Sequence, residues 1–220
     1  MIKEGRLQRG SLNSEIYISK FRQVLLRHGL TMSLIAAMCI CVPFIPSVLF
    51  SSLSNLFIAP NKYFFWSFCV GIMILIFLKS TNRDLNLRQI FWIIYLFIIS
   101  LVEEIAFRLS IPLIAIEVFG TGLFWFYVFL SNILFASIHY FTLRWKIRAC
   151  ILAFLGGMAF SRVLESTEDL ALLIILHWAI TFLNTPTAPK IENLAMKNWS
   201  YLLQKKINPP KLLPKSDSNK

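Results

Sequence analysis

The sequence predicts an all-α polytopic membrane protein, a bundle of about six transmembrane helices with amphipathic surface helices at its termini. Hydrophobic residues make up 57% of the 220 residues and charged residues only 15%, where a soluble domain carries about 25% charged residues. The mean hydropathy is +0.66. The apolar runs are continuous, whereas the strands of a membrane barrel alternate apolar and polar residues. Helices are therefore the expected spanning elements.

Each of the six expected spans is an apolar run bounded by polar or turn residues, and together they cover residues 30–50, 63–78, 90–116, 123–142, 149–163 and 170–184. Proline cannot donate a backbone hydrogen bond inside a helix. We therefore expect Pro43 and Pro46 to kink the first span and Pro112 to bend the third.

Lysine and arginine are distributed unevenly between the two sides of this arrangement. Of the 22 basic residues, 19 lie in the two tails and in the loops 79–88 and 144–148, two lie on the other side, and Arg108 lies within a span. Short cytoplasmic loops carry an excess of Lys and Arg. The count predicts that both termini are cytoplasmic. It also accounts for the net charge of +11 without a nucleic-acid partner.

Three regions follow from this arrangement: a basic cytoplasmic N-terminal segment, a transmembrane domain and a basic C-terminal tail, at residues 1–29, 30–184 and 185–220. Apolar residues recur at helical spacing at Ile18, Phe21 and Leu25. This spacing indicates an amphipathic helix on the membrane surface, although a solvated basic tail fits the composition as well. Residues 191–206 predict a second, short interfacial helix in the C-terminal tail.

The third span is unusual because Glu103, Glu104 and Arg108 lie within its apolar run. A charge at the centre of a membrane helix disfavours insertion by roughly 2.5–3.5 kcal/mol. Such residues usually face a protein interior or a wet cavity, where they find partners. These three residues therefore predict a functional site within the membrane domain.

Glu104 and Arg108 are four residues apart, so they can pair on one helix face. Glu103 points about 100° away and has no partner on its own helix. The fourth and sixth spans offer partners, each set sharing one helix face: Phe135 and His139 on the fourth, and His177, Thr181 and Asn184 on the sixth. At 1.5 Å per residue, His139 falls closer to the cytoplasmic side than Glu103 and His177 do.

This set of residues suits hydrolysis. A carboxylate and an imidazole around one water can act as general base and then general acid, and a second imidazole with a nearby hydroxyl or amide can stabilise an oxyanion. Glu103, His139 and His177 can alternatively hold Zn²⁺ or another divalent metal. Structural readings also remain open: Glu104–Arg108 as an ion pair, and each histidine as a bond between helices.

The motifs resemble those of the CAAX prenyl protease and bacteriocin-processing family (CPBP, also called Abi) of intramembrane metalloproteases. Residues 103–108 fit the motif EExxxR and residues 135–139 fit FxxxH. His177 begins a match to a third motif, HxxxN. The resemblance covers residues 90–184.

This resemblance implies a membrane-embedded peptidase acting on a peptide or protein substrate at the bilayer. Glu103 and His139 would activate water, His177 would stabilise the oxyanion, and Glu104 and Arg108 would complete the first motif. The motifs leave open whether a metal takes part. Family members include enzymes that remove the last three residues of prenylated proteins. The compact plan fits a bacterial inner membrane, and the sequence predicts no oligomeric state.

Two positions depart from the family motifs. Thr181 stands where the third motif has Asn, although Asn184 follows one turn later, and Leu109 follows Arg108 where the family often has Gly. Threonine has a hydroxyl but no amide. A non-catalytic scaffold or chaperone is therefore an alternative function. A transporter with proton-relay residues is another.

Overall fold

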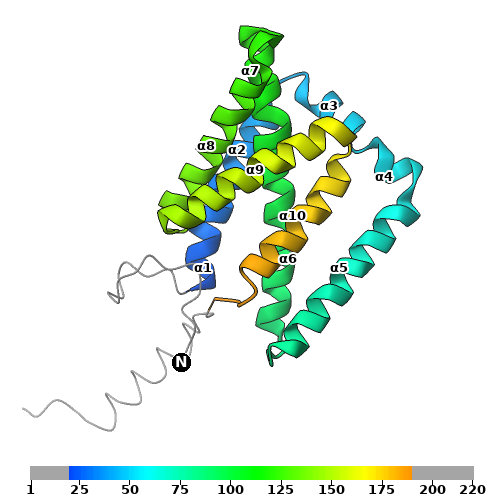
Figure 1. Ribbon diagram of the computed structural model, residues 1–220, viewed down its shortest axis with the longest axis vertical. Coiled ribbons are helices and arrows are strands. Elements are labelled where there is room, and N and C mark those ends of the chain that lie inside the picture. The colour runs from blue at the N-terminus through cyan, green and yellow to red at the C-terminus, as the bar shows by residue number, and fades with distance from the viewer. Residues whose placement is uncertain (1–19, 190–220) are drawn as a thin grey trace, which may run out of the picture. The chain divides into compact units, whose positions relative to one another are not determined.

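The computed structural model describes residues 20–189 (Figure 1). Outside this part of the chain lie residues 1–19, most of the C-terminal tail and the surface helix expected at 191–206. Residues 20–189 contain helices and no strand. They form α1 Phe21–Val24, η1 Leu25–Gly29, α2 Leu30–Ile40, α3 Ile45–Ser52, α4 Ser54–Ile58, α5 Pro60–Ser80, α6 Leu87–Glu103, η2 Glu104–Ser110, α7 Ile111–Phe119, η3 Thr121–Leu123, α8 Phe124–Thr142, α9 Ile147–Thr167 and α10 Leu170–Asn184.

Five helical stretches in this part of the chain are long and apolar enough to cross a bilayer: Phe21–Ile40, Pro60–Ser80, Leu87–Phe119, Thr121–Thr142 and Ile147–Thr167. The sixth expected span is α10, an apolar helix of 15 residues. At 1.5 Å per residue it is about 22 Å long, less than the roughly 30 Å hydrocarbon core of a bilayer. The prediction of an all-α polytopic membrane protein is confirmed.

The first span begins nine residues before the expected start. Residues 21–29, expected in the N-terminal segment, form a helix that runs without interruption into α2. Its basic residues Arg22 and Arg27 are exposed, while Val24 and His28 are buried on another face. The Arg27 guanidinium donates to the backbone carbonyls of residues 141 and 142 and so satisfies acceptors at the end of α8. The basic residues therefore do not mark a separate tail.

Prolines act at helix boundaries in both places where kinks were expected. The first span ends at Ile40, Pro43 lies in the following turn, and Pro46 lies in the first turn of α3, where a missing N–H leaves no bond unmade. Pro112 is in the first turn of α7, directly after the π-helical segment η2. Because Pro112 has no N–H, it cannot bond the carbonyl of Arg108.

The helix α6 packs against α2 and α10, and η2, which continues it, also packs against α8 and α9 (Figure 1). All residues of η2 are buried, and the buried core includes Trp92, Phe107, Phe135 and Phe182. Because α6 and η2 together contact α2, α8, α9 and α10, a polar side chain at their junction meets several helices at once.

Small residues bring α9 close to α8 and η2. A Cβ added to Gly157 would overlap the side-chain oxygen of Asn132 and lie 2.9 Å from Nη2 of Arg108. The amide of Asn132 donates to Oγ of Ser161 at 3.1 Å, and that hydroxyl donates to the carbonyl of Gly157 at 3.0 Å. Gly157 therefore permits the close approach of α9 to these buried polar groups.

We predict that Gly157→Ala lowers the free energy of unfolding by about 1–3 kcal/mol, the usual cost of overpacking. The neighbouring Gly156 is the matched control, because a Cβ there meets nothing within 4 Å. Gly156→Ala should leave stability unchanged or raise it by up to about 1 kcal/mol. Unfolding of both variants in mixed micelles measures the difference, and equal stability of the two would contradict this packing.

Candidate active site

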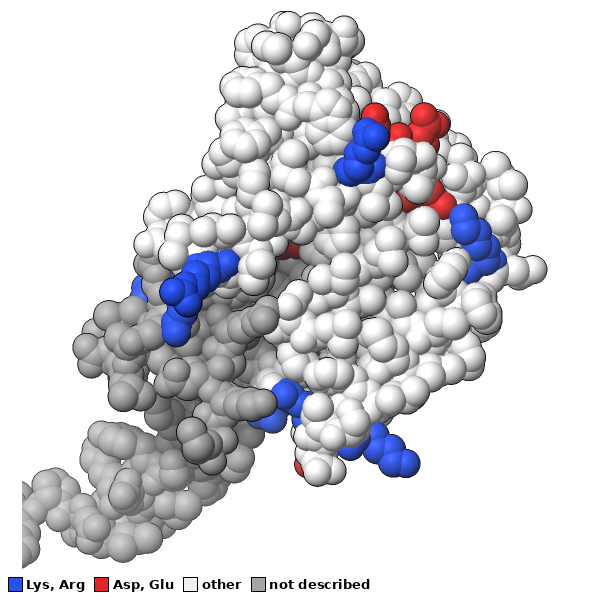
Figure 2. Space-filling view, viewed as in Figure 1, with Lys and Arg blue, Asp and Glu red and all other residues white. Residues whose placement is uncertain are grey.

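A cavity of about 380 Å³ lies between η1, α6, α8, α9 and α10, and most of its lining is apolar. Glu103 is the one acidic side chain among the described residues that line it. Figure 2 shows a hollow on this face of the protein with acidic atoms at its base. The cavity therefore combines an apolar wall with a single carboxylate.

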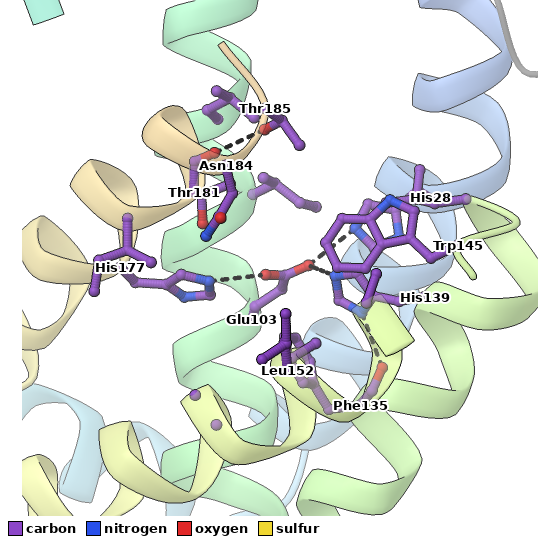
Figure 3. Close-up of a pocket in the computed structure, with 18 of the residues that line it drawn as sticks. His28, Glu103, Phe135, His139, Trp145, Leu152, His177, Thr181, Asn184 and Thr185 are labelled. Atoms are coloured by element: carbon purple, nitrogen blue, oxygen red, sulfur yellow. Dashed lines mark hydrogen bonds and ion pairs between the residues drawn. The ribbon is translucent and has the colours of Figure 1, made fainter. Parts of the chain in front are cut away.

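All three histidines of the chain surround Glu103, which is 2% exposed. Its Oε1 lies 2.9 Å from Nε2 of His28 and 3.5 Å from Nε2 of His139, and its Oε2 lies 3.6 Å from Nε2 of His177 (Figure 3). The sequence predicts that His139 lies closer to the cytoplasmic side than Glu103 and His177. In the structure both histidines nevertheless reach the Glu103 carboxylate. One carboxylate thus meets histidines from three other helical segments.

His139 is held in place by its own helix and by aromatic rings. Its Nδ1 donates to the carbonyl of Phe135 at 2.9 Å, which turns Nε2 toward Glu103. The ring of Phe135 lies 4.4 Å from the His139 ring, and the ring of Trp145 lies 4.7 Å from it on the loop after α8. This packing restricts the imidazole to one orientation.

Arg108 lines the cavity and Glu104 lies behind it, and the two side chains pair as the i,i+4 spacing predicts. Oε1 of Glu104 is 3.6 Å from Nε of Arg108 and 2.5 Å from Nδ1 of His177, and neither contact has hydrogen-bond geometry. The Arg108 guanidinium lies 3.9 Å above the ring of Phe135. His177 therefore lies between the two carboxylates, with Nδ1 toward Glu104 and Nε2 toward Glu103.

Thr181 and Asn184 line the cavity from α10, together with Thr185 (Figure 3). The hydroxyl of Thr185 donates to the carbonyl of Thr181 at 2.7 Å. The sequence-predicted residues are thus all at the cavity or directly against it. The position that departs from the third motif, Thr181, presents a hydroxyl on the same helix face as His177.

One protein-family model matches the part of the chain that carries most of this site. Residues 84–183 match the model described as type II CAAX prenyl endopeptidase Rce1-like. Over these residues the chain is similar to this family of endopeptidases. The match spans just under half of the chain and includes Glu103, His139 and His177. Comparisons with curated proteins and with solved structures returned no match.

His28 was missed by the sequence reasoning and lies outside the segment that matches the CAAX protease family. The basic residues Arg22 and Arg27 before it favour an N-terminal segment over a membrane span. One signal was available: His28 follows Val24 by four residues, and both fall on the apolar face of the helix. Trp145 was also missed, because it lies in a basic loop.

The donor set at the cavity fits a metal ion of the zinc class. Ligand atoms of His28, Glu103 and His139 lie within 4.8 Å of one another, and two imidazoles with one carboxylate are a known zinc ligand set. The sequence expected His177 in place of His28. His177 is not part of this group and has its Nδ1 edge against Glu104.

We predict that Arg108→Gln destabilises the protein by about 3–5 kcal/mol, because it leaves the Glu104 charge buried without its cation. Both side chains are at most 1% exposed. The control is Arg162→Gln, which breaks an exposed pair with Glu165 and should cost less than about 1 kcal/mol. Thermal unfolding in detergent compares the two. Similar losses would show that Arg108 is no more important than a surface arginine.

Proposed function

We propose that the protein is an intramembrane endopeptidase that hydrolyses a peptide bond with a water activated at Glu103. The observation that carries this proposal is the position of the Glu103 carboxylate, buried in the cavity with Nε2 atoms of His139 and His177 at 3.5 and 3.6 Å. The match of residues 84–183 to the type II CAAX prenyl endopeptidase family supports it. Such distances leave the groups within reach of a shared water.

In the proposed reaction, the water oxygen attacks the carbonyl carbon of the scissile bond while Glu103 accepts a proton from it. His139 orients this water, directly through Nε2 or, when a metal ion is bound there, through that ion. The carbonyl oxygen becomes an oxyanion, for which His177 and the hydroxyl of Thr181 are the nearby donors. The tetrahedral intermediate then collapses, the C–N bond breaks, and Glu103 returns its proton to the leaving nitrogen.

Glu104 acts through His177, and Arg108 acts through Glu104. Glu104 lies against Nδ1 of His177 and fixes the ring so that Nε2 faces the cavity. A metal ion, when bound by cavity residues, would supply Lewis-acid polarisation of the water.

The proposed substrate class is a peptide with a lipid attached near its C-terminus, as the family description implies. The apolar lining of the cavity supports this class, because it would receive a lipid chain without burying polar groups. The cavity extends along α8 and α10 to Trp145 and Thr185, at the end of the bundle that carries the basic loops 79–88 and 144–148. The distribution of basic residues favours a cytoplasmic location for this end.

The same charge distribution supports a chain with both termini in the cytoplasm. A bacterial inner membrane is the location we propose, on the basis of the compact bundle. A second candidate function, a non-catalytic scaffold, is favoured by one observation: Thr181 stands where the family motif has Asn, so an amide donor is absent from that position.

We predict that Glu103→Gln reduces cleavage by at least about 10²–10⁴-fold, the usual contribution of a general base. His139→Ala should reduce it by a similar factor. The measurement uses the full-length protein in liposomes with a farnesylated peptide ending in a CAAX sequence, and release of the C-terminal tripeptide is followed by mass spectrometry.

Glu117→Gln is the matched control for this experiment. Glu117 is exposed on α7, in the same helical stretch as Glu103, and its substitution should leave cleavage unchanged. Equal cleavage by Glu103→Gln and the unmodified protein would refute the mechanism. If the unmodified protein released no tripeptide, the scaffold function would be favoured.

A further inference from the structure

The hydrogen bonds around His139 fix which ring nitrogen carries its proton. Nδ1 lies 2.9 Å from the backbone carbonyl oxygen of Phe135. A carbonyl oxygen can only accept, so Nδ1 must donate. In the neutral ring, Nε2 then has no hydrogen and presents a lone pair, and this atom faces Oε1 of Glu103 at 3.5 Å.

The same reasoning applies to His28 through a chain of two contacts. Its Nδ1 lies 2.9 Å from Oγ1 of Thr142. The single hydrogen of that hydroxyl is donated to the carbonyl of Ile138 at 2.6 Å, so Oγ1 accepts at His28. Nδ1 of His28 therefore carries a hydrogen. In the neutral ring, Nε2 presents a lone pair to Oε1 of Glu103 at 2.9 Å.

Three acceptors thus converge on one point: two imidazole lone pairs and one carboxylate oxygen. All three side chains are buried, with exposed fractions of 2–4%. Acceptors at these separations repel one another unless a cation lies between them. Histidine ligands of metals usually have the other ring nitrogen bonded to a carbonyl or another acceptor, and this is the arrangement of both rings.

We propose that His28, Glu103 and His139 form a binding site for a divalent transition metal of the zinc class, and that the first helix completes it. The proposal deepens the proposed function, because it rests on the same cavity and gives Oε1 and Oε2 of Glu103 different tasks. Oε1 binds the metal with the two rings. Oε2 faces His177 and remains free to receive the proton of the water.

The distances suit such an ion. Zinc–ligand bonds of about 2.0–2.2 Å in tetrahedral geometry separate ligand atoms by about 3.4 Å. The separation of Glu103 Oε1 from His139 Nε2 is 3.5 Å, and that from His28 Nε2 is 2.9 Å. A small outward movement of the His28 ring would equalise them. Three protein ligands leave the fourth position open for water or substrate.

The helix that carries His28 is fixed against the rest of the site. Arg27 donates to the carbonyl oxygens at the end of α8 at 3.1 and 3.2 Å, and Thr142 on α8 bonds the ring of His28 itself. His28 also lies in a π-helical segment, η1, and such segments frequently occur at functional sites. The ligand from outside the family segment is therefore positioned by α8, the helix that carries His139.

The test measures Co²⁺ binding by the purified, metal-stripped, full-length protein in detergent, from the visible absorption of the bound ion. We expect one bound equivalent. His28→Ala should weaken binding by more than about 100-fold, and Thr142→Val, which removes a bond to a ligand, should weaken it by about 10–100-fold. His177→Ala is the matched control, since it removes a histidine that faces the same carboxylate, and it should bind Co²⁺ within about threefold of the unmodified protein.

Absence of Co²⁺ binding in the unmodified protein would overturn the proposal, and a proton would then be the cation between His28 and Glu103. Full binding by His28→Ala, or loss of binding in His177→Ala, would also overturn it. Each variant is first compared with the unmodified protein by gel filtration and helical circular dichroism. If His28→Ala does not fold, the milder variant Thr142→Val still tests the proposal, because it should weaken Co²⁺ binding without removing a ligand.

Metal binding and peptide cleavage are measured separately, so their failures are distinguishable. Co²⁺ binding without cleavage would retain the metal site and contradict the proposed function. Cleavage of the farnesylated peptide by a protein that binds no Co²⁺ would contradict the metal site and retain the proposed function.

Discussion

The burial of the Glu103 carboxylate is the constraint on which the rest of this structure depends. A charged group at this depth is costly unless other groups in the protein compensate it. Here the compensation comes from His28, His139 and His177, which all place a ring nitrogen within 3.6 Å of it. Each histidine belongs to a different helical segment, so the carboxylate is satisfied only when the bundle is assembled.

Several features of the bundle serve this arrangement. Glu103 is the last residue of α6, directly before the π-helical segment η2, and His28 lies in η1, the other π-helical segment of the described residues. Arg108 offsets the neighbouring charge of Glu104, which in turn lies against His177. Gly157 lets α9 approach Arg108. The polar groups around Glu103 are thus supported by a second set of polar groups packed against them.

Much of this could be predicted from the sequence, because a charge in an apolar run has few physical explanations. Helical spacing separated Glu103 from the Glu104–Arg108 pair and identified His139 and His177 as partners on other helices. His28 could not be predicted in the same way, because the basic residues before it are typical of a solvated tail. In the structure they lie on the exposed face of the first helix. The metal ligands could not be chosen from the sequence, since the side on which His177 meets Glu104 depends on how α10 packs against α6.

The carboxylate of Glu103 contacts every histidine of the chain, and nuclear magnetic resonance of the ring nitrogens tests these contacts. In protein labelled with ¹⁵N-histidine, three ring systems are observed, since the chain has three histidines. We expect Glu103→Gln to shift the ring nitrogen signals of all three, and Glu104→Gln to shift mainly those of His177. A Glu103→Gln spectrum in which any one histidine is unchanged would contradict these contacts.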